Sequence, residues 1–517
     1  MDLSAVDMLR GLAEATTSVT AEFTNAPLTV AGELPAAIDG FYFRNGPGRF
    51  ERGGRRYLHP FDGDGHVTRL DISSGAVCYT NRFVRTEEYL AEERAGRMLY
   101  RSFGTNLPGG LLGNLFRLNF KNAANTSVRW HAGRLLALWE GGAPYRLDPT
   151  TLATLGREDF VRGLASPFSG MSRRLAPLLP FSAHPHIAGG TGELYNFGLV
   201  SGRPNLLMLY RVGADGVMEA PRQHPLSRFS FVHDLGVTRR WLCFLLPQAD
   251  FDIGRALLGL TTAVGSLHIA TERPMQMLLL PRERGSAEPR IISGPPGFVF
   301  HIAQAFDDSN GRVVLDVIRY GCYPEFDAIE ELFRDPPEGA APRLERLILD
   351  PAREYCERIG FGDDLARHAF ELPVSAPAAL GEPQRILYGV GAPPERRTPY
   401  LTSIMRLDTA TGALTTRDFG LDLVGEPMLV PGAIGDEGWL LSLVFRVGQS
   451  RTDLVVLRAA DLAIQATTAL PHALPVGFHG CWVPRAELAT TSRWAAFSRN
   501  TIGFGDAAAS PLSFQPR

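Results

Sequence analysis

Short apolar runs bounded by turn residues recur along the whole chain, and long stretches with helical periodicity are few. One recurring unit is a polar turn followed by a strongly apolar strand. Its copies are HAGRLLALWE (131–140), GGTGELYNFG (189–198), TRRWLCFLLP (238–247), SNGRVVLDVIRY (309–320) and GDEGWLLSLVF (435–445). A second unit is a strand that ends in a polar turn, as in Arg69-Leu70-Asp71 and Arg406-Leu407-Asp408. Such strand–turn–strand units from one end of the chain to the other predict the blades of a β-propeller.

The spacing of these units is irregular, so we expect insertions between the strands. The segments around 99–120, 252–266 and 325–370 are the expected insertions, and they look partly helical. No Ser- or Pro-rich linker divides the chain. The sequence therefore predicts one domain over residues 1–517, dominated by β structure, with residues 1–30 as a helical N-terminal extension.

Composition narrows the function classes. The formal net charge is -3, which offers no basic field for a nucleic-acid backbone. The five cysteines are scattered and never form a CxxC pair, which argues against a disulfide framework and a cysteine-ligated metal. The N-terminus lacks the pattern of a signal peptide, and no apolar run reaches about 18 residues. These features favour a cytoplasmic protein.

Four of the twelve histidines stand at similar places in the repeat. His184, His233 and His301 each precede, by about six to ten residues, the turn that opens an apolar strand, and His479 lies on a comparable strand. Because the inner strands of a propeller surround one channel, side chains at equivalent inner positions can converge. Four neutral imidazoles suit a divalent transition metal such as iron(II), zinc or copper.

Coordination number separates two kinds of metal site. Four protein ligands on an octahedral metal leave two positions for dioxygen, whereas zinc would be closed and structural. Ligating imidazoles normally donate their second N–H to an acceptor, often a carboxylate. Three glutamates in otherwise uncharged surroundings are candidates for this role, namely Glu140, Glu371 and Glu426.

Several longer motifs resemble those of the carotenoid cleavage oxygenase family. They follow one another in the family's order over roughly residues 30 to 490. The motifs are GFYFRNGPGRF (40–50), HPFDGDGHV (59–67), KNAANTSV (121–128), WEGG (139–142), SAHPHI (182–187), FVHDLGVT (231–238), FHIAQAFDD (300–308), GEPMLVP (425–431) and FHGCWVP (478–484).

The resemblance implies a seven-bladed β-propeller capped by a dome of helices and loops, with one iron(II) per chain on the axis. The implied iron ligands are His184, His233, His301 and His479. In the same way, Glu140 would orient His233, Glu371 would orient His301, and Glu426 would orient His479. Thr126 would stand beside an open coordination site and help to define where oxygen binds.

The implied activity is oxidative cleavage of a conjugated C=C bond of a carotenoid or apocarotenoid by O2, which gives two carbonyl products. Neither nicotinamide nor flavin is needed, and the sequence has no convincing dinucleotide motif. Trp139, Phe231 and Phe300 are the candidates for the wall of an apolar tunnel that takes the hydrophobic polyene. An apolar patch at 107–116, with the N-terminal stretch from Leu3 to Leu12, would contact a membrane surface without spanning it.

Departures from the family pattern leave alternatives open. Gln304 and Asp307 stand where the family usually has Asn and Glu, and GPGRF replaces the commoner GPNP. Stilbene-cleaving members carry a lysine just before the glutamate that corresponds to Glu140, where this chain has Trp139, which favours a carotenoid or apocarotenoid. From a different class, the chain could be a non-catalytic propeller that binds a ligand or a protein and uses its metal only structurally.

Overall fold

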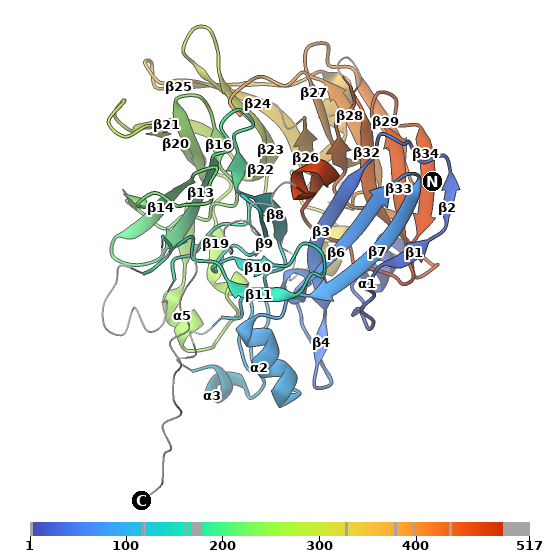
Figure 1. The fold of residues 1–517 in the computed structure, drawn as a ribbon. Coiled ribbons are helices and arrows are strands. Elements are labelled where there is room, and N and C mark those ends of the chain that lie inside the picture. Colours follow the sequence, from blue (N-terminus) through green and yellow to red (C-terminus); the bar gives the residue numbers. More distant parts are fainter. Residues whose placement is uncertain are drawn as a thin grey trace, which may run out of the picture.

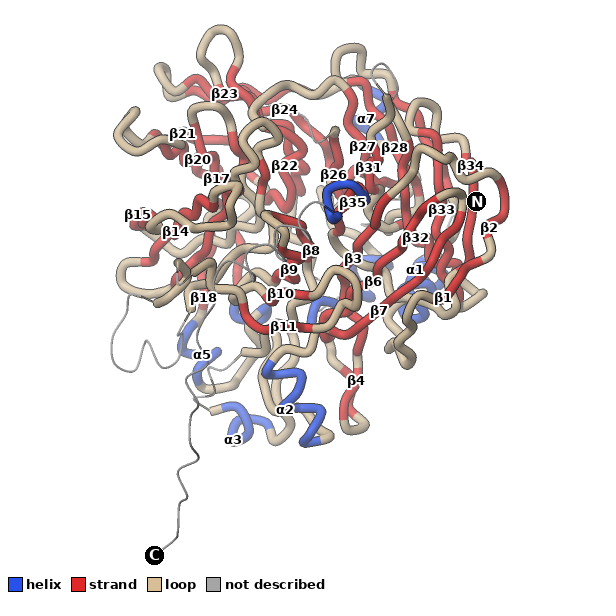
Figure 2. Tube along the Cα trace, in the orientation of Figure 1, coloured by secondary structure: helices blue, strands red, loops and turns tan. Residues whose placement is uncertain are grey.

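Seven β-sheets of four or more strands are arranged around a common axis in the computed structural model (Figures 1 and 2). The model describes residues 4–115, 117, 120–161, 163–166, 178–325, 329–376, 380–396, 400–433 and 437–489. The chain is thus a seven-bladed β-propeller, as the sequence predicts. Blade 1 is the sheet that contains β35, and the other six blades are numbered in the order in which their innermost strands occur along the chain.

The strands of each blade are given in their order within the sheet. Blade 1 consists of β1 (Ala26–Leu28), β7 (Ala76–Phe83), β6 (Asp64–Ser73), β3 (Gly40–Arg49) and β35 (Gly480–Pro484). Blade 2 consists of β11 (Thr154–Arg157), β10 (Tyr145–Leu147), β9 (Arg134–Leu138) and β8 (Ser127–His131). Blade 3 consists of β12 (His186–Ile187), β13 (Leu194–Val200), β14 (Asn205–Val212) and β15 (Arg222–Leu226). Blade 4 consists of β16 (Gly236–Val237), β17 (Trp241–Leu246), β20 (Pro274–Pro281) and β21 (Arg290–Pro296).

The remaining three blades come from the second half of the chain, apart from one strand. Blade 5 consists of β22 (Phe298–Asp307), β23 (Val313–Tyr320), β24 (Arg343–Asp350) and β25 (Tyr355–Ile359). Blade 6 consists of β26 (Ala369–Ser375), β27 (Ile386–Ala392), β28 (Ser403–Asp408) and β29 (Leu414–Asp418). Blade 7 consists of β2 (Val30–Gly32), β34 (Ile464–Ala469), β33 (Arg451–Arg458), β32 (Trp439–Arg446), β30 (Leu423–Val424) and β31 (Met428–Val430), which also pairs with β32.

Two-stranded hairpins and short helices occupy the connections. The hairpins are β4 (Glu51–Arg52) with β5 (Arg55–Arg56), and β18 (Ala249–Phe251) with β19 (Leu267–Ile269). The helices are α1 (Ala5–Glu14), η1 (Pro60–Asp62), α2 (Glu87–Ala95), α3 (Gly110–Asn114), α5 (Ile253–Leu257), η2 (Val264–Ser266), α6 (Ile329–Arg334) and α7 (Asp363–Arg367). Helices α2, α3 and α5 lie at one end of the molecule, at the bottom of Figure 1.

The strands inside the blades read as unbroken apolar runs because both faces of a blade pack against its neighbours. All six residues of β17 are buried, for example. The ring is closed by pairing between the two ends of the chain, since β3 pairs with β35 in blade 1 and β2 pairs with β34 in blade 7. This closure holds both ends of the chain in the ring, while the outermost strand of each blade keeps one unpaired edge.

The predicted insertions are only partly helical. Segments 99–120 and 252–266 contain α3, α5 and η2, whereas 325–370 contains α6 and α7 and, between them, the two outer strands of blade 5, β24 and β25. Within residues 1–30, α1 packs on the body of the molecule, where its Gly11 contacts Tyr400. Residues 26–28 form a strand of blade 1. Among the described residues, no helix is long and apolar enough to cross a membrane.

His66, on β6 of blade 1, contacts Asn81, and Asn81 in turn contacts the N-terminal segment. The side-chain amide of Asn81 donates to the carbonyl of Ala21 (2.8 Å) and lies 3.0 Å from Nε2 of His66. Burial, together with His472, lowers the pKa of His66 to about 3, so the ring is neutral and accepts from the amide. Protonation would place an N–H opposite the amide N–H and break this contact.

We therefore expect His66 to make the protein acid-sensitive. The folded-state pKa of about 3 lies below the ordinary value of 6.5, so neutral His66 stabilises the fold above pH 6.5, and this contribution is lost as the pH falls toward 3. In a His66→Gln variant, the slope of unfolding free energy against pH in this window should be shallower by up to about 1.4 kcal/mol per pH unit. Urea unfolding at several pH values measures the slope, and equal slopes for the two proteins would contradict the assignment.

Candidate metal centre

Four imidazoles meet at the axis of the propeller. His184 and His233 come just before the inner strands β12 and β16, His301 lies in β22, and His479 comes just before β35. One ring nitrogen of each lies within 4.8 Å of the other three. The Nε2 atoms of His301 and His479 are 3.3 Å apart. The structure thus brings together the four histidines that the sequence singles out.

The other three blades also direct one side chain toward this centre. Thr126 comes just before β8 in blade 2, Glu371 lies in β26 of blade 6, and Glu426 lies between β30 and β31 in blade 7. Each of the seven blades therefore supplies a residue that lies in its inner strand or close to it. Glu371 and Glu426 occupy the positions that the histidines hold in other blades.

Irregular pairing at the inner strands aims these side chains at the axis. In β22 the register shifts between Val299 and Ile302, on either side of His301. In β26 the register shifts after Glu371, and the next residue, Leu372, has a φ of 47°. Bulges of this kind bend a strand and redirect its side chains. The site is thus built by local departures from the regular ladder.

Two of the glutamates hold histidines through their outer ring nitrogens. Oε2 of Glu371 lies 2.6 Å from Nδ1 of His301, and Oε1 of Glu426 lies 2.7 Å from Nδ1 of His479. A carboxylate at Nδ1 favours the Nδ1–H tautomer, so the Nε2 lone pair points to the centre. Glu140 is looser, because its Oε1 lies 3.3 Å from Nδ1 of His233 and 3.9 Å from Nε2 of His184. Each predicted histidine–glutamate pair therefore lies in contact distance, and two of the three are hydrogen bonded.

Burial sets the charge of the imidazoles. Burial lowers the pKa values of His184 and His233 well below the ordinary value, and their histidine neighbours lower them further. Burial also lowers the pKa of His479, against the opposing effect of Glu426. At His301, burial acts in the same direction, but Glu371 outweighs it and the pKa is raised. The rings of His184, His233 and His479 are therefore neutral, and each can offer a nitrogen lone pair to a metal ion.

Arg44 explains why Glu426 is ionised although it is buried. Its Nη1 donates to Oε2 of Glu426 (2.6 Å), which also accepts from the backbone N–H of Gly480 (3.0 Å). Burial alone would raise the pKa of Glu426, but His479 and Arg44 outweigh burial and lower the pKa to about 2. Burial raises the pKa of Glu140 well above the ordinary value, with Asp234 adding to the effect.

These residues fit a divalent transition metal. Nε2 of His184 and Oε1 of Glu140 are buried, and neither has a hydrogen-bond partner in the described part of the chain. Convergent lone pairs without donors between them call for a cation, and imidazole nitrogens backed by carboxylates suit a transition metal. Within the described ranges, this is the single group of three or more His, Cys, Asp or Glu residues arranged to hold a metal ion.

A cavity of about 320 Å³ lies against the histidine cluster. Its wall includes His233, His301 and His479, the predicted Thr126, and all three predicted tunnel aromatics, Trp139, Phe231 and Phe300. Further aromatic residues line the rest of the cavity, namely Phe50, Phe61, Phe103, Tyr320, Tyr323, Phe333, Tyr400 and Phe478. The cavity is suited to a long apolar ligand that reaches the metal centre.

Three residues at the site escaped the sequence analysis. Arg44 and Tyr320 hold glutamates, and Asp234 accepts from the backbone N–H of Ile302 (2.8 Å) and lies 2.8 Å from Nε2 of His186. Arg44 and Asp234 could have been found as charged residues within apolar stretches. Arg44 lies in GFYFRNGP, and Asp234 directly follows His233. Tyr320 had no such signal.

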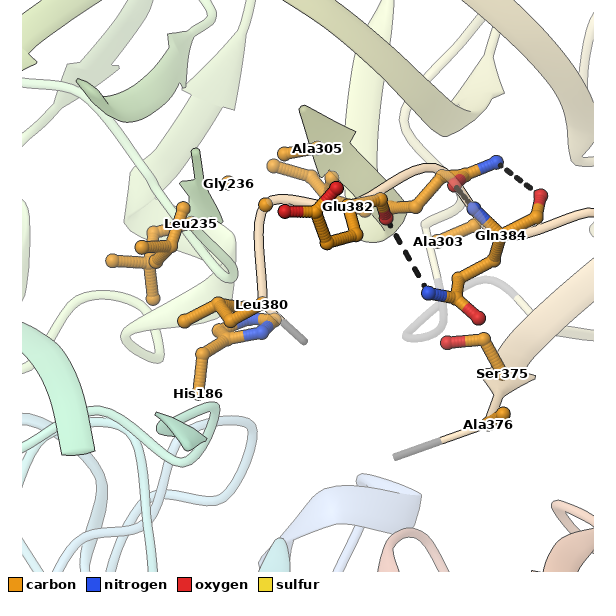
Figure 3. Close-up of a pocket in the computed structure, with 14 residues that line it drawn as sticks. His186, Leu235, Gly236, Ala303, Ala305, Ser375, Ala376, Leu380, Glu382 and Gln384 are labelled. Carbon is orange, nitrogen blue, oxygen red and sulfur yellow. Dashed lines mark hydrogen bonds between the residues drawn. The ribbon is translucent and has the colours of Figure 1, made fainter. Parts of the chain in front are cut away.

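Gln304 and Asp307, the two residues that depart from the family pattern, form hydrogen bonds to neighbouring loops. Gln304 lines a smaller pocket of about 90 Å³, where Figure 3 shows His186, Glu382 and Gln384. Oε1 of Gln304 accepts from the backbone N–H of Gln384 (2.6 Å). Asp307 accepts from the backbone N–H of Arg240 (3.1 Å). Both side chains lie in β22 and hold segments of neighbouring blades, and neither belongs to the four-histidine cluster.

Comparisons with known proteins agree with this geometry. Residues 16–484 match the family model described as retinal pigment epithelial membrane protein (RPE65). The chain is 35% identical to the apocarotenoid-15,15'-oxygenase of Synechocystis sp. over 468 residues, which covers 88% of this chain and 92% of the relative. It is 30% identical to the isoeugenol monooxygenase of Pseudomonas putida, with coverages of 88% and 94%. The crystal structure of cobalt-substituted Synechocystis ACO aligns with a TM-score of 0.83 at 34% identity, covering 93% of this chain and 99% of that one.

Replacing Arg44 with Met should destabilise the fold. The change leaves the buried carboxylate of Glu426 without its cation, and breaking a buried pair from one side costs about 3–5 kcal/mol. Arg458→Met is the matched control, because the pair of Arg458 with Asp461 is about half exposed, and solvent-exposed pairs contribute little to stability. Urea unfolding of the metal-free proteins gives both values, and equal losses for the two variants would contradict the role of Arg44.

Proposed function

The chain belongs to the retinal pigment epithelial membrane protein family, and we propose that it is a non-haem iron(II) dioxygenase. The proposed reaction is cleavage of one conjugated C=C bond of a carotenoid or apocarotenoid by O2, with two carbonyl products. The observation that carries the proposal is the four-imidazole centre that faces an apolar, aromatic cavity. We take the chain as one propeller domain that holds one iron(II).

The proposed iron ligands are His184, His233, His301 and His479. When bound, iron(II) supplies the redox chemistry by which dioxygen reacts with the alkene, and both oxygen atoms enter the products, so no external reductant is required. Glu371 and Glu426 keep His301 and His479 in the orientation that presents Nε2 to the centre. Glu140 is placed to do the same for His233.

Thr126 and the aromatic wall would position the two reactants. The hydroxyl of Thr126 donates to Oδ1 of Asn125 (3.2 Å), which leaves its methyl group as the apolar part beside the centre. Phe300 packs edge-on against His233 with ring centroids 5.2 Å apart, and it lines the cavity together with Trp139 and Phe231. Rings at these positions can stack on a polyene, fix which double bond faces the metal, and keep water out.

The substrate class follows from the similarity and from Trp139. The identity is 35% to the apocarotenoid-15,15'-oxygenase and 29% to resveratrol cleavage oxygenase 1 of Aspergillus fumigatus. Trp139 supplies an apolar ring where a phenol-binding enzyme would need a polar group. A stilbene-type substrate is the alternative activity. A non-catalytic propeller with a structural metal would need a closed site, whereas four nitrogen ligands leave an octahedral metal two open positions.

A membrane surface is the proposed source of the hydrophobic substrate. Leu111 and Leu112 on α3 are 47% and 86% exposed, and Leu260 after α5 is 56% exposed. The two helices are neighbours, since Gly259 packs against Asn114 of α3. Exposed leucines on adjacent helices form the kind of patch that inserts shallowly into lipid. On α1, Val6 is exposed, but Met8 is buried against the body, and Leu3 lies outside the described residues.

Anaerobically purified, iron-loaded protein should bleach the polyene absorption of an apocarotenoid in detergent when O2 is admitted. With ¹⁸O₂, mass spectrometry should find label in both carbonyl fragments, because one oxygen atom goes to each. A panel that includes a hydroxystilbene decides the substrate class in the same experiment. Cleavage of the stilbene alone would favour the alternative activity, and stoichiometric zinc without iron would rule out the dioxygenase.

His301→Ala is the variant for this experiment, and His268→Ala is its control. Loss of one of four nitrogen ligands should remove most of the bound iron and abolish the bleaching. His268 is an exposed histidine on β19, so its replacement should change neither value. Full iron occupancy in His301→Ala would show that the ligand set is wrong.

Leu112→Glu should weaken binding to lipid vesicles without unfolding the protein, because a charge on the proposed patch opposes insertion into lipid. Val217→Glu provides a matched control, since Val217 is also exposed (49%) but lies in a turn of blade 3. Co-sedimentation with phosphatidylcholine vesicles compares the two variants with the natural chain. Equal binding of all three proteins would contradict the proposed patch.

A further inference from the structure

The three glutamates of the site differ in what holds them. Glu426 is fixed by Arg44, and Oε1 of Glu140 has no hydrogen-bond partner in the described part of the chain. Glu371 is held by a phenol, because the hydroxyl of Tyr320 donates to its Oε1 (3.1 Å). The other oxygen, Oε2, accepts from the backbone N–H of Leu372 and lies 2.6 Å from Nδ1 of His301. Both oxygens of Glu371 are therefore engaged.

Tyr320 stands at the boundary between the metal centre and the cavity. It ends β23 in blade 5, whereas Glu371 belongs to the inner strand of blade 6, so the hydrogen bond joins two blades. The ring packs edge-on against Phe300, with centroids 5.5 Å apart and planes at 83°, and it forms part of the cavity wall. Burial, and then Glu371, raises the pKa of Tyr320 well above the ordinary value, so the phenol remains a donor.

A carboxylate fixed at both oxygens cannot turn about its terminal bond. Glu371 is 4% exposed, so few water molecules can replace a missing donor at Oε1. Without the phenol, the carboxylate could rotate away from Nδ1 of His301, and the lone pair at Nε2 would lose its direction. Groups that orient a ligating imidazole in this way commonly change metal affinity by about 10–100-fold when they are removed.

We propose that Tyr320 is a positioning residue that holds Glu371, and through it His301, in the orientation that metal binding requires. Because the ring of Tyr320 is also part of the cavity wall, a ligand in the cavity restrains the same residue. Cavity ligand and metal should then each strengthen the binding of the other by the same factor. This coupling rests on the proposed function, whereas the positioning role rests on the contacts alone.

Tyr320→Phe tests the positioning role, because it keeps the ring and removes only the hydroxyl. We expect cobalt(II) to bind about tenfold more weakly and its visible absorption bands to shift, since the field at His301 changes. Tyr388→Phe is the matched control. The hydroxyl of Tyr388 also donates to a carboxylate oxygen, Oε2 of Glu437 (2.6 Å). Tyr388 lies in β27 of blade 6 and is not part of the cavity wall. An unchanged cobalt affinity and spectrum in folded Tyr320→Phe would overturn the proposal, and so would equal losses in both variants.

A saturated C20 isoprenoid alcohol, which has no double bond to cleave, tests the coupling. Its binding can be followed by tryptophan fluorescence, because Trp139 is part of the cavity wall. The alcohol should raise the cobalt(II) affinity of the natural chain several-fold and that of Tyr320→Phe much less. Equal increases in both proteins would overturn the coupling through Tyr320. If the alcohol does not bind at all, the proposed apolar substrate class is wrong, while the cobalt affinities measured without it still decide the role of Tyr320.

Discussion

The convergence of seven inner strands on one axis is the constraint on which the rest of this structure depends. It brings residues far apart in the chain, such as Thr126 and His479, to one point, where the backbone N–H of His479 donates to the carbonyl of Thr126 (3.1 Å). Each blade supplies a side chain from its inner strand or close to it, and the register shifts in β22 and β26 aim two of them. Because the ring is closed through β3 and β35, these positions are held from both ends of the chain.

Burial of polar groups at this point needs compensation, and each glutamate receives it differently. Glu426 has a cation, Arg44, and Glu371 has a phenol, Tyr320. Glu140 has the weakest support among the described residues, and burial raises its pKa. A divalent cation at the centre would offset the carboxylate charge that burial disfavours. The same metal that would serve the chemistry would thus also stabilise the fold at its axis.

A second buried network holds the start of the segment that leads to Thr126. Lys121, the sole lysine, lies 2.6 Å from Oδ1 of Asp64 and 3.1 Å from Oε2 of Glu92, and it donates to the hydroxyl of Tyr57 (2.7 Å). These contacts fix α2, which carries Glu92, to β6 of blade 1, which carries Asp64. Lys121 begins the segment that leads to Thr126, so the network also anchors one side of the site. Rigid support of this kind suits a cavity that must hold a long, apolar ligand in one position.

The sequence by itself determined the repeat, the four histidines and their likeness to an iron-binding family, because apolar strand runs and motif residues are local features. It also paired Glu371 with His301 and Glu426 with His479, which are hydrogen bonded in the structure, but only through that likeness. Tertiary structure alone decided that β24 and β25 complete blade 5, since outer strands leave no distinctive local pattern. It likewise decided the roles of Arg44 and Tyr320, whose partners lie 382 and 51 residues away. Such contacts exist only once the blades close, so no spacing in the sequence records them.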